Sequence, residues 1–147
     1  LLQTEEAGLE AILRQKVREL QERYCLQFSD PKLKLITRRS AECQIDVETA
    51  VEEIKAVHEA VEDYAGKFSL RNDLDISFTE EARDRLVEKV WENGVDAVDY
   101  LNQAFQNYEH GLKLIREKTG QRSFSITAEG MEYPERYLNR LIQETYR

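Results

Sequence analysis

Asp75-Ile76-Ser77-Phe78-Thr79-Glu80-Glu81-Ala82 is the stretch of the sequence that decides the fold. Its first half alternates apolar and polar residues, as a short strand with one buried face does. Thr79 then offers a hydroxyl that can cap a helix. Glu80 and Glu81 place negative charge in the first helical turn, where it suits the helix dipole. The stretch therefore predicts a strand that passes directly into a helix.

Two more runs share this form, in which apolar, polar and apolar residues precede a hydroxyl: Leu26-Gln27-Phe28-Ser29 and Phe124-Ser125-Ile126-Thr127. The three runs begin at intervals of 50 and 48 residues. Because a strand this short is not stable alone, we expect two or three of the runs to pair in a small sheet. A pattern this loose also recurs by chance, and a fuller match supports the first two runs best. We interpret the first two runs as repeats of one local structure, and the third run as a strand of the same sheet.

Helical periodicity fills the chain between the runs. Apolar residues recur at steps of three and four along 9–24, 46–68, 79–93 and 95–118, and again after Pro134. The expected helix starts are the N-caps Asp30, Asp46, Thr79 and Asp96, with Pro31 and Pro134 in first turns. Gly94 and Gly120 are the expected ends of two helices, and Gly66 lies near the expected end of the helix at 46–68. Helices therefore account for most of the chain.

Composition narrows the fold class. The chain has 147 residues, of which only six are Gly and two are Pro, while 34% are charged and 41% hydrophobic. This argues against sandwiches with many turns and against disorder. We predict a mostly α fold, a helical bundle with a small two- or three-stranded sheet, as one domain over 1–147. Its parts are an entry helix, strand and helix (1–45), a long helix (46–68), and further helices and strands (75–147).

Charge and cysteine content restrict the partners and the compartment. The net charge of −8 disfavours nucleic acid as a partner. No apolar run approaches the ~18 residues of a membrane span, so we expect no membrane insertion. Cys25 and Cys43 lack the spacing of a zinc or redox site, and we expect ordinary thiols in the cytoplasm. The chain begins Leu1-Leu2-Gln3 and its single Met is Met131, so we expect a domain cut from a longer protein.

The second half of the chain, from Asp75 onward, resembles the small C-terminal helical lid subdomain of Clp-type AAA+ ATPases. That subdomain often has an apolar-polar-apolar strand, Thr-Glu-Glu-Ala opening a helix, a Gly near the helix end, a second helix and a last strand. Here the matching parts are 76–78, 79–93, Gly94, 95–118 and 124–127. Residues 9–36 also look like the entry to such a subdomain, and the helix at 47–68 has no clear place in the pattern.

The resemblance implies a lid over a nucleotide that transmits the ATP state to neighbouring subunits. Gly94, Val95 and Asp96 are then the nucleotide-proximal candidates. The family has an Arg where this chain has Asp96, and a carboxylate there repels phosphate. Either direct nucleotide sensing by this segment is lost, or another cation such as Arg116 or Arg122 takes that role.

The chain alone carries no P-loop, since none of its glycines precedes Lys and Ser or Thr in the required spacing. We therefore expect no catalytic residues, no metal site and no bound cofactor in this chain. ATP and Mg²⁺ would belong to the parent protein, an ATP-dependent chaperone or a protease-associated unfoldase. The expected partners are the parent ATPase core and neighbouring subunits. The alternative is a stand-alone helical interaction or oligomerisation module.

Aromatic residues and histidines supply the remaining candidates. Trp91, Tyr100, Tyr133 and Tyr137 are either core packing or a docking face for another domain. His58 and His110 could each serve as a general base, but without a nearby nucleophile we expect surface or boundary positions for both. Oppositely charged residues at i,i+4 spacing, such as Glu10–Arg14 and Glu81–Arg85, predict ion pairs that stabilise the exposed surfaces of helices.

Overall fold

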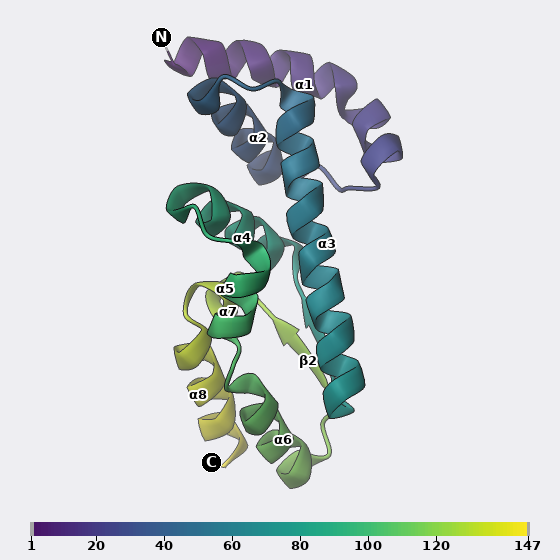
Figure 1. The fold of residues 1–147 in the computed structure, drawn as a ribbon, viewed down its shortest axis with the longest axis vertical. Coiled ribbons are helices and arrows are strands. Elements are labelled where there is room, and N and C mark those ends of the chain that lie inside the picture. Colours follow the sequence, from purple (N-terminus) through teal and green to yellow (C-terminus); the bar gives the residue numbers. More distant parts are fainter. Residues whose placement is uncertain (1, 147) are drawn as a thin grey trace. The chain divides into compact units, whose positions relative to one another are not determined.

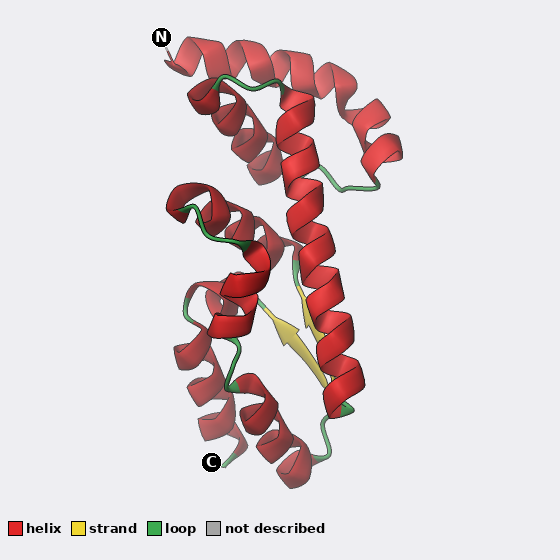
Figure 2. Cartoon of the chain, in the orientation of Figure 1, coloured by secondary structure: helices red, strands yellow, loops and turns green. Residues whose placement is uncertain are grey.

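A computed structural model describes residues 2–146, which contain eight helices and a two-stranded sheet (Figures 1 and 2). The elements are α1 (Leu2–Tyr24), α2 (Asp30–Cys43), α3 (Val47–Asn72), β1 (Asp75–Phe78), α4 (Glu80–Asn93), α5 (Ala97–Ala104), α6 (Tyr108–Thr119), β2 (Ser123–Ile126), α7 (Ala128–Glu132) and α8 (Pro134–Thr145). The predicted fold class, mostly helical with a small sheet, is confirmed. None of the described helices has the length and apolar character needed to cross a membrane.

The chain forms two compact units, unit 1 (Leu1–Ala56) and unit 2 (Val57–Arg147), and α3 contributes to both. In unit 1, α1 packs against α2. Arg39 of α2 donates two hydrogen bonds, of 3.1 and 3.2 Å, to the carboxylate of Glu53 on α3. The core of unit 1 includes apolar side chains from all three helices: Leu13, Leu20, Leu33, Ile36, Val47, Ala50, Val51 and Ile54.

The run 26–28 in unit 1 is not a strand, so this prediction was wrong. Leu26 is buried, but the residues up to Ser29 form an irregular connection from α1 to α2. A strand needs a neighbour for its backbone groups, and β2 pairs with β1. The helix cap is also shifted by one residue: the hydroxyl of Ser29, rather than Asp30, accepts a hydrogen bond from the Lys32 amide.

In unit 2 the sheet joins two of the predicted runs. β1 and β2 are parallel, with Asp75 opposite Ser123 and Phe78 opposite Ile126. Both strands show exposed and buried residues in alternation, so their apolar side chains share one face. The ladder ends where the Thr79 amide donates to the Ile126 carbonyl at 3.0 Å. The Thr79 hydroxyl then caps α4 by accepting from the Ala82 amide, as predicted.

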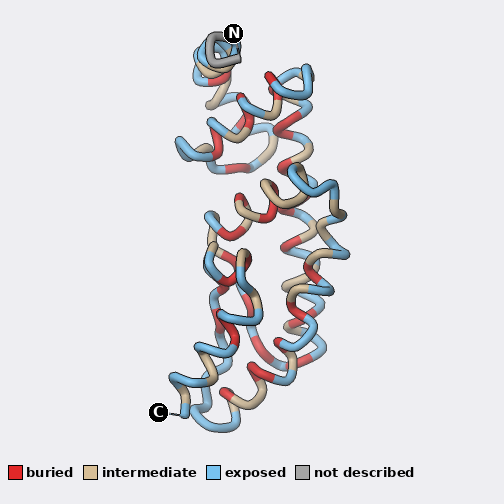
Figure 3. The backbone as a smooth tube through the Cα atoms, turned by 90° about the vertical axis from the view of Figure 1, so that its left-hand side faces the viewer, coloured by how far each residue is buried: buried red, intermediate tan, exposed pale blue. Residues whose placement is uncertain are grey.

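Helix α3 is longer than its sequence pattern suggested. The helix was expected to end at residue 68, with Gly66 near that end, but it continues to Asn72, and the left-handed residue that ends it is Asp73 (φ 53°). Phe68 is fully buried, so helical continuation beyond Gly66 keeps a large apolar side chain in the core. Buried and exposed residues alternate along α3 with the helical period (Figure 3).

The predicted helix 95–118 is two helices rather than one. Helix α5 ends at Ala104, and α6 begins at Tyr108. The break brings the rings of Phe105 and Tyr108, both buried, to 4.6 Å between centroids in an edge-to-face pair. The left-handed ends at Gly94 and Gly120 and the start at Pro134 are confirmed. The short helix α7, capped by Thr127, was not predicted.

Candidate functional site

The three nucleotide-proximal candidates form the turn between α4 and α5. Gly94 adopts a left-handed conformation (φ 63°, ψ 28°), and its amide bonds the Val90 carbonyl at 3.0 Å. Asp96 caps α5, where its carboxylate accepts from the Asp99 amide at 3.1 Å. Gly94 and Asp96 are exposed and Val95 is half-buried. The turn therefore presents a carboxylate to solvent, and part of that carboxylate's hydrogen-bonding capacity holds its own helix.

The alternative cations, Arg116 and Arg122, lie near the segment that leads into β1. Arg116 donates to the carbonyls of Asn72 and Asp73, at 3.1 and 3.4 Å. Arg122 pairs with the Asp73 carboxylate at 3.1 Å. Both guanidinium groups thus tie the end of α3 to the segment between α6 and β2.

The four aromatic candidates have different environments. Tyr137 is buried and donates to the Ser125 carbonyl at 3.0 Å. Tyr100 is half-buried and donates to the Met131 carbonyl at 2.7 Å. Tyr133 is exposed, and the Arg136 guanidinium lies 4.5 Å from its ring centroid. Trp91 is half-buried. Tyr100 and Tyr137 thus bond the backbone of the C-terminal segment.

Glu132 of α7 joins two cations of α4. Its carboxylate lies 2.6 Å from Arg85 Nε and 3.0 Å from Lys89 Nζ. Hydrogen bonds from Arg85 and then from Lys89 lower the pKa of Glu132 to about 2. The prediction that Arg85 pairs with Glu81 was wrong, because Glu132 and Glu88 take its donors. The predicted Glu10–Arg14 pair is present at 2.9 Å.

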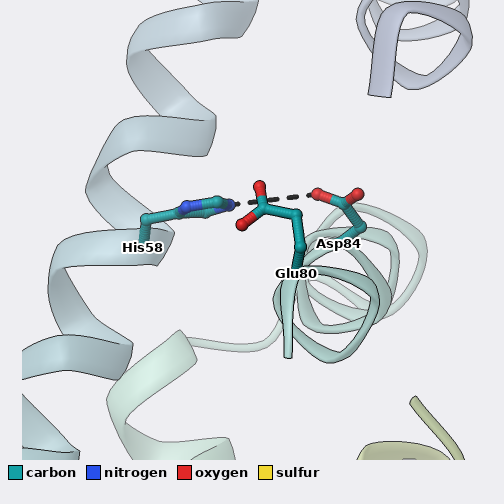
Figure 4. Close-up of side chains that lie close together, drawn as sticks. All are labelled: His58, Glu80 and Asp84. Carbon is teal, nitrogen blue, oxygen red and sulfur yellow. Dashed lines mark ion pairs between the residues drawn. The ribbon is translucent and has the colours of Figure 1, made fainter. Parts of the chain in front are cut away.

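A group not predicted as a site lies within unit 2, where His58 of α3 faces Glu80 and Asp84 of α4 (Figure 4). One potential ligand atom from each residue lies within 4.8 Å of the other two. The imidazole Nε2 of His58 is 3.9 Å from Asp84 Oδ1. His58 and Asp84 are 5% and 7% exposed. The Glu80 side chain is 32% exposed, so one side of the group is open to solvent.

The guanidinium group of Arg83 lies close to this group. Arg83 pairs with Glu62 of α3 and lies 4.0 Å from the Glu80 carboxylate. The Arg83 guanidinium therefore interacts with the carboxylates of both Glu62 and Glu80. The buried imidazole and the two carboxylates offer one nitrogen and several oxygens to a proton or to a cation.

Sequence reasoning placed His58 at the surface or a boundary, and for this residue it was wrong. Glu80 and Asp84 have i,i+4 spacing, which puts both on one helix face and was the available signal. The histidine comes from another helix, 22 residues before Glu80, so only the packing of α3 on α4 reveals the group. His110 is exposed, as predicted.

Comparisons with known proteins give no relative: no family model, no curated protein and no solved structure matches this chain.

Proposed function

We propose that this chain is the C-terminal lid or regulatory domain of a Clp-type AAA+ ATPase in the cytoplasm. The observation that carries the proposal is the order of elements from β1 to β2. A strand, a Thr79-capped helix, a left-handed Gly94, two helices and a returning strand succeed one another in unit 2. This is the order that the family resemblance implies, apart from the break between α5 and α6.

In this role the domain packs on the nucleotide-binding core and on neighbouring subunits without performing the chemistry. The chain has no P-loop, so ATP and Mg²⁺ bind in the parent protein upstream. Asp96 gives the α4–α5 turn a negative charge, which repels phosphate. The domain therefore transmits the nucleotide state through its packing on the core rather than by holding the phosphate at this turn.

The parent coding sequence tests the proposal directly. A G-x-x-x-x-G-K-[ST] segment within the few hundred residues before Leu1 is the expected finding. The absence of such a segment overturns the proposal.

Kinetics of the parent protein test the position of the turn. Asp96→Asn keeps a capping oxygen and removes one negative charge. If the turn faces the nucleotide, this change lowers the KM for ATP by about threefold, given one unit charge at about 6 Å in water. Asp99→Asn, in the first turn of the same helix, is the matched control and leaves KM unchanged. Equal effects of the two variants contradict a nucleotide-facing turn.

The second candidate function is a stand-alone interaction or oligomerisation module. It is favoured by four large apolar side chains that unit 2 exposes to solvent: Leu70, Val98, Tyr133 and Tyr146. Beside Tyr100 and Pro134 there is also an open hollow of about 360 Å³. Sedimentation of the purified chain over a range of concentrations tests oligomerisation. Association that weakens in Tyr133→Ser supports it, and a monomer at every concentration contradicts it.

A further inference from the structure

The group of His58, Glu80 and Asp84 contains a buried nitrogen that the described part of the chain leaves without a hydrogen bond. His58 Nε2 has almost no contact with solvent and no hydrogen-bond partner among the described residues. A buried polar atom in this condition destabilises the folded state. The nitrogen points from α3 toward the two carboxylates of α4 (Figure 4). His58 Nε2 therefore points to the position that an ion bound by all three side chains would occupy.

The distances favour a bridging ion over a direct contact. At 3.9 Å, His58 Nε2 and Asp84 Oδ1 are too far apart for a hydrogen bond. Two ligands that each lie about 2.1 Å from one tetrahedral metal are separated by about 3.4 Å. Small side-chain rotations bring His58 and Asp84 to that separation. Glu80 has the longer side chain of the two carboxylates and the more exposed position, so it can close in on the ion as it binds.

We propose that His58 Nε2 and one carboxylate oxygen each of Glu80 and Asp84 bind a divalent transition-metal ion, with Zn²⁺ as the best match. One imidazole nitrogen and two carboxylate oxygens are ligands that zinc accepts. Mg²⁺ and Ca²⁺ prefer oxygen ligands alone, and Mn²⁺ binds such mixed sites more weakly than Zn²⁺. The two carboxylates balance the charge of the dication. Arg83 keeps Glu62 as its partner when the metal occupies Glu80.

The metal would act as a clip between two helices of unit 2. His58 belongs to α3, whereas Glu80 and Asp84 lie in the first turns of α4, next to the capped end of β1. Binding at these three residues stabilises the folded state to an extent that rises with metal concentration. The exposed side of Glu80 provides an entry path and leaves room for a water molecule as the fourth ligand.

The histidine ring nitrogens give the most direct test, because His58 and His110 are the only histidines. The experiment uses the 147-residue chain with Cys25→Ser and Cys43→Ser, since both thiols are exposed and could take up zinc. Equimolar ZnCl2 is expected to move the Nε2 resonance of His58 to the metal-bound range, to leave His110 unchanged, and to be reversed by EDTA. A His58 Nε2 resonance that stays unchanged in excess zinc overturns the proposal.

Thermal unfolding in the same background supplies an independent test. Zinc at about 100 times its Kd should raise the apparent Tm by about 5–10 °C. Asp84→Asn and Glu80→Gln each remove a ligand and should weaken zinc binding at least about tenfold. Glu81→Gln, an exposed change on the same helix, should keep the full shift. Should Asp84→Asn fail to fold, the half-exposed Glu80→Gln decides. Equal zinc shifts in all three variants overturn the proposal.

Discussion

Residues 26–44 and 76–94 have closely matching local structures, yet a strand forms in only one of them. A hydroxyl, Ser29 or Thr79, caps a helix of 14 residues in each segment. Each helix ends in a left-handed residue, Gln44 (φ 54°) or Gly94 (φ 63°), 50 positions apart. Local side-chain chemistry therefore fixes both helices in the same way.

The difference between the segments lies in the chain that comes after each helix. After α4 the chain returns through α5 and α6 to β2, which pairs with β1 over four residues. After α2 the chain continues into α3, and residues 26–28 remain irregular. The comparison teaches that an apolar-polar-apolar run becomes a strand when a distant segment supplies its hydrogen bonds.

The largest expected effect comes from a substitution in β1, the strand that forms from the second run. Phe78 is 5% exposed, and its ring centroid lies 5.5 Å from that of Phe105. We expect Phe78→Ala to lower the free energy of unfolding by about 3–5 kcal/mol, because it leaves a cavity under the sheet. Urea unfolding followed by the fluorescence of Trp91, the only tryptophan, measures this change in unit 2.

The equivalent residue of the first run is the matched control. Phe28 is half-buried and belongs to no strand. Phe28→Ala should therefore cost about 1 kcal/mol or less in unfolding followed by circular dichroism. Similar costs for the two variants would show that strand pairing adds nothing to the burial of Phe78.

The next effect tests an ion-pair network that holds α4 to α7. Glu132 pairs with Arg85 and Lys89, and its side chain is 26% exposed. Glu132→Gln should lower the free energy of unfolding by about 1–2 kcal/mol at neutral pH, allowing for screening by solvent. Urea unfolding of the wild type and of Glu132→Gln at pH 7 measures the difference in the free energy of unfolding.

The pH dependence comes from the lowered pKa of Glu132, about 2 against 4.5 for an unperturbed carboxyl. The unfolded chain takes up the proton first, so this contribution to stability is complete above about pH 4.5. It is lost as the pH falls toward 2. The difference between wild type and Glu132→Gln should thus shrink between about pH 4.5 and pH 2. A constant difference over that range would mean that charge is not the cause.

A reciprocal exchange at the two helix ends should have a smaller effect. Gly94 and Gln44 have the same left-handed conformation, which costs a residue with a Cβ atom about 1 kcal/mol. We expect Gly94→Gln to destabilise the protein by about 1 kcal/mol and Gln44→Gly to stabilise it by a similar or smaller amount. Thermal unfolding of both variants checks the signs. Two changes of the same sign would contradict the equivalence of the two ends.

The sequence predicted the features that depend on local chemistry. Thr79, Gly94 and Gly120 mark helix boundaries because caps and left-handed ends need only nearby backbone groups. The strand at 26–28 was wrong, and the predicted end of α3 at residue 68 came four residues too early, because strand pairing and core packing decide these features.

The candidate site was less predictable for the same reason. Glu80 and Asp84 could be placed on one helix face from their spacing, whereas His58 joins them through the packing of α3 on α4. Glu132 likewise meets Arg85 across 47 residues of sequence. Contacts of this kind have no signature within any short window of the chain.

The smallest expected effect tests why α3 passes through a glycine. Gly66 lies inside the helix, and a Cβ atom added there meets nothing within 4 Å. Gly66→Ala should therefore stabilise the protein by about 0.5–1 kcal/mol in thermal unfolding, since alanine loses less backbone entropy in a helix. Gly130→Ala, where the added Cβ would lie 2.8 Å from Ile126 Cγ2, is the control and should be destabilising. A loss of stability in Gly66→Ala would mean that this position needs the conformational freedom of glycine.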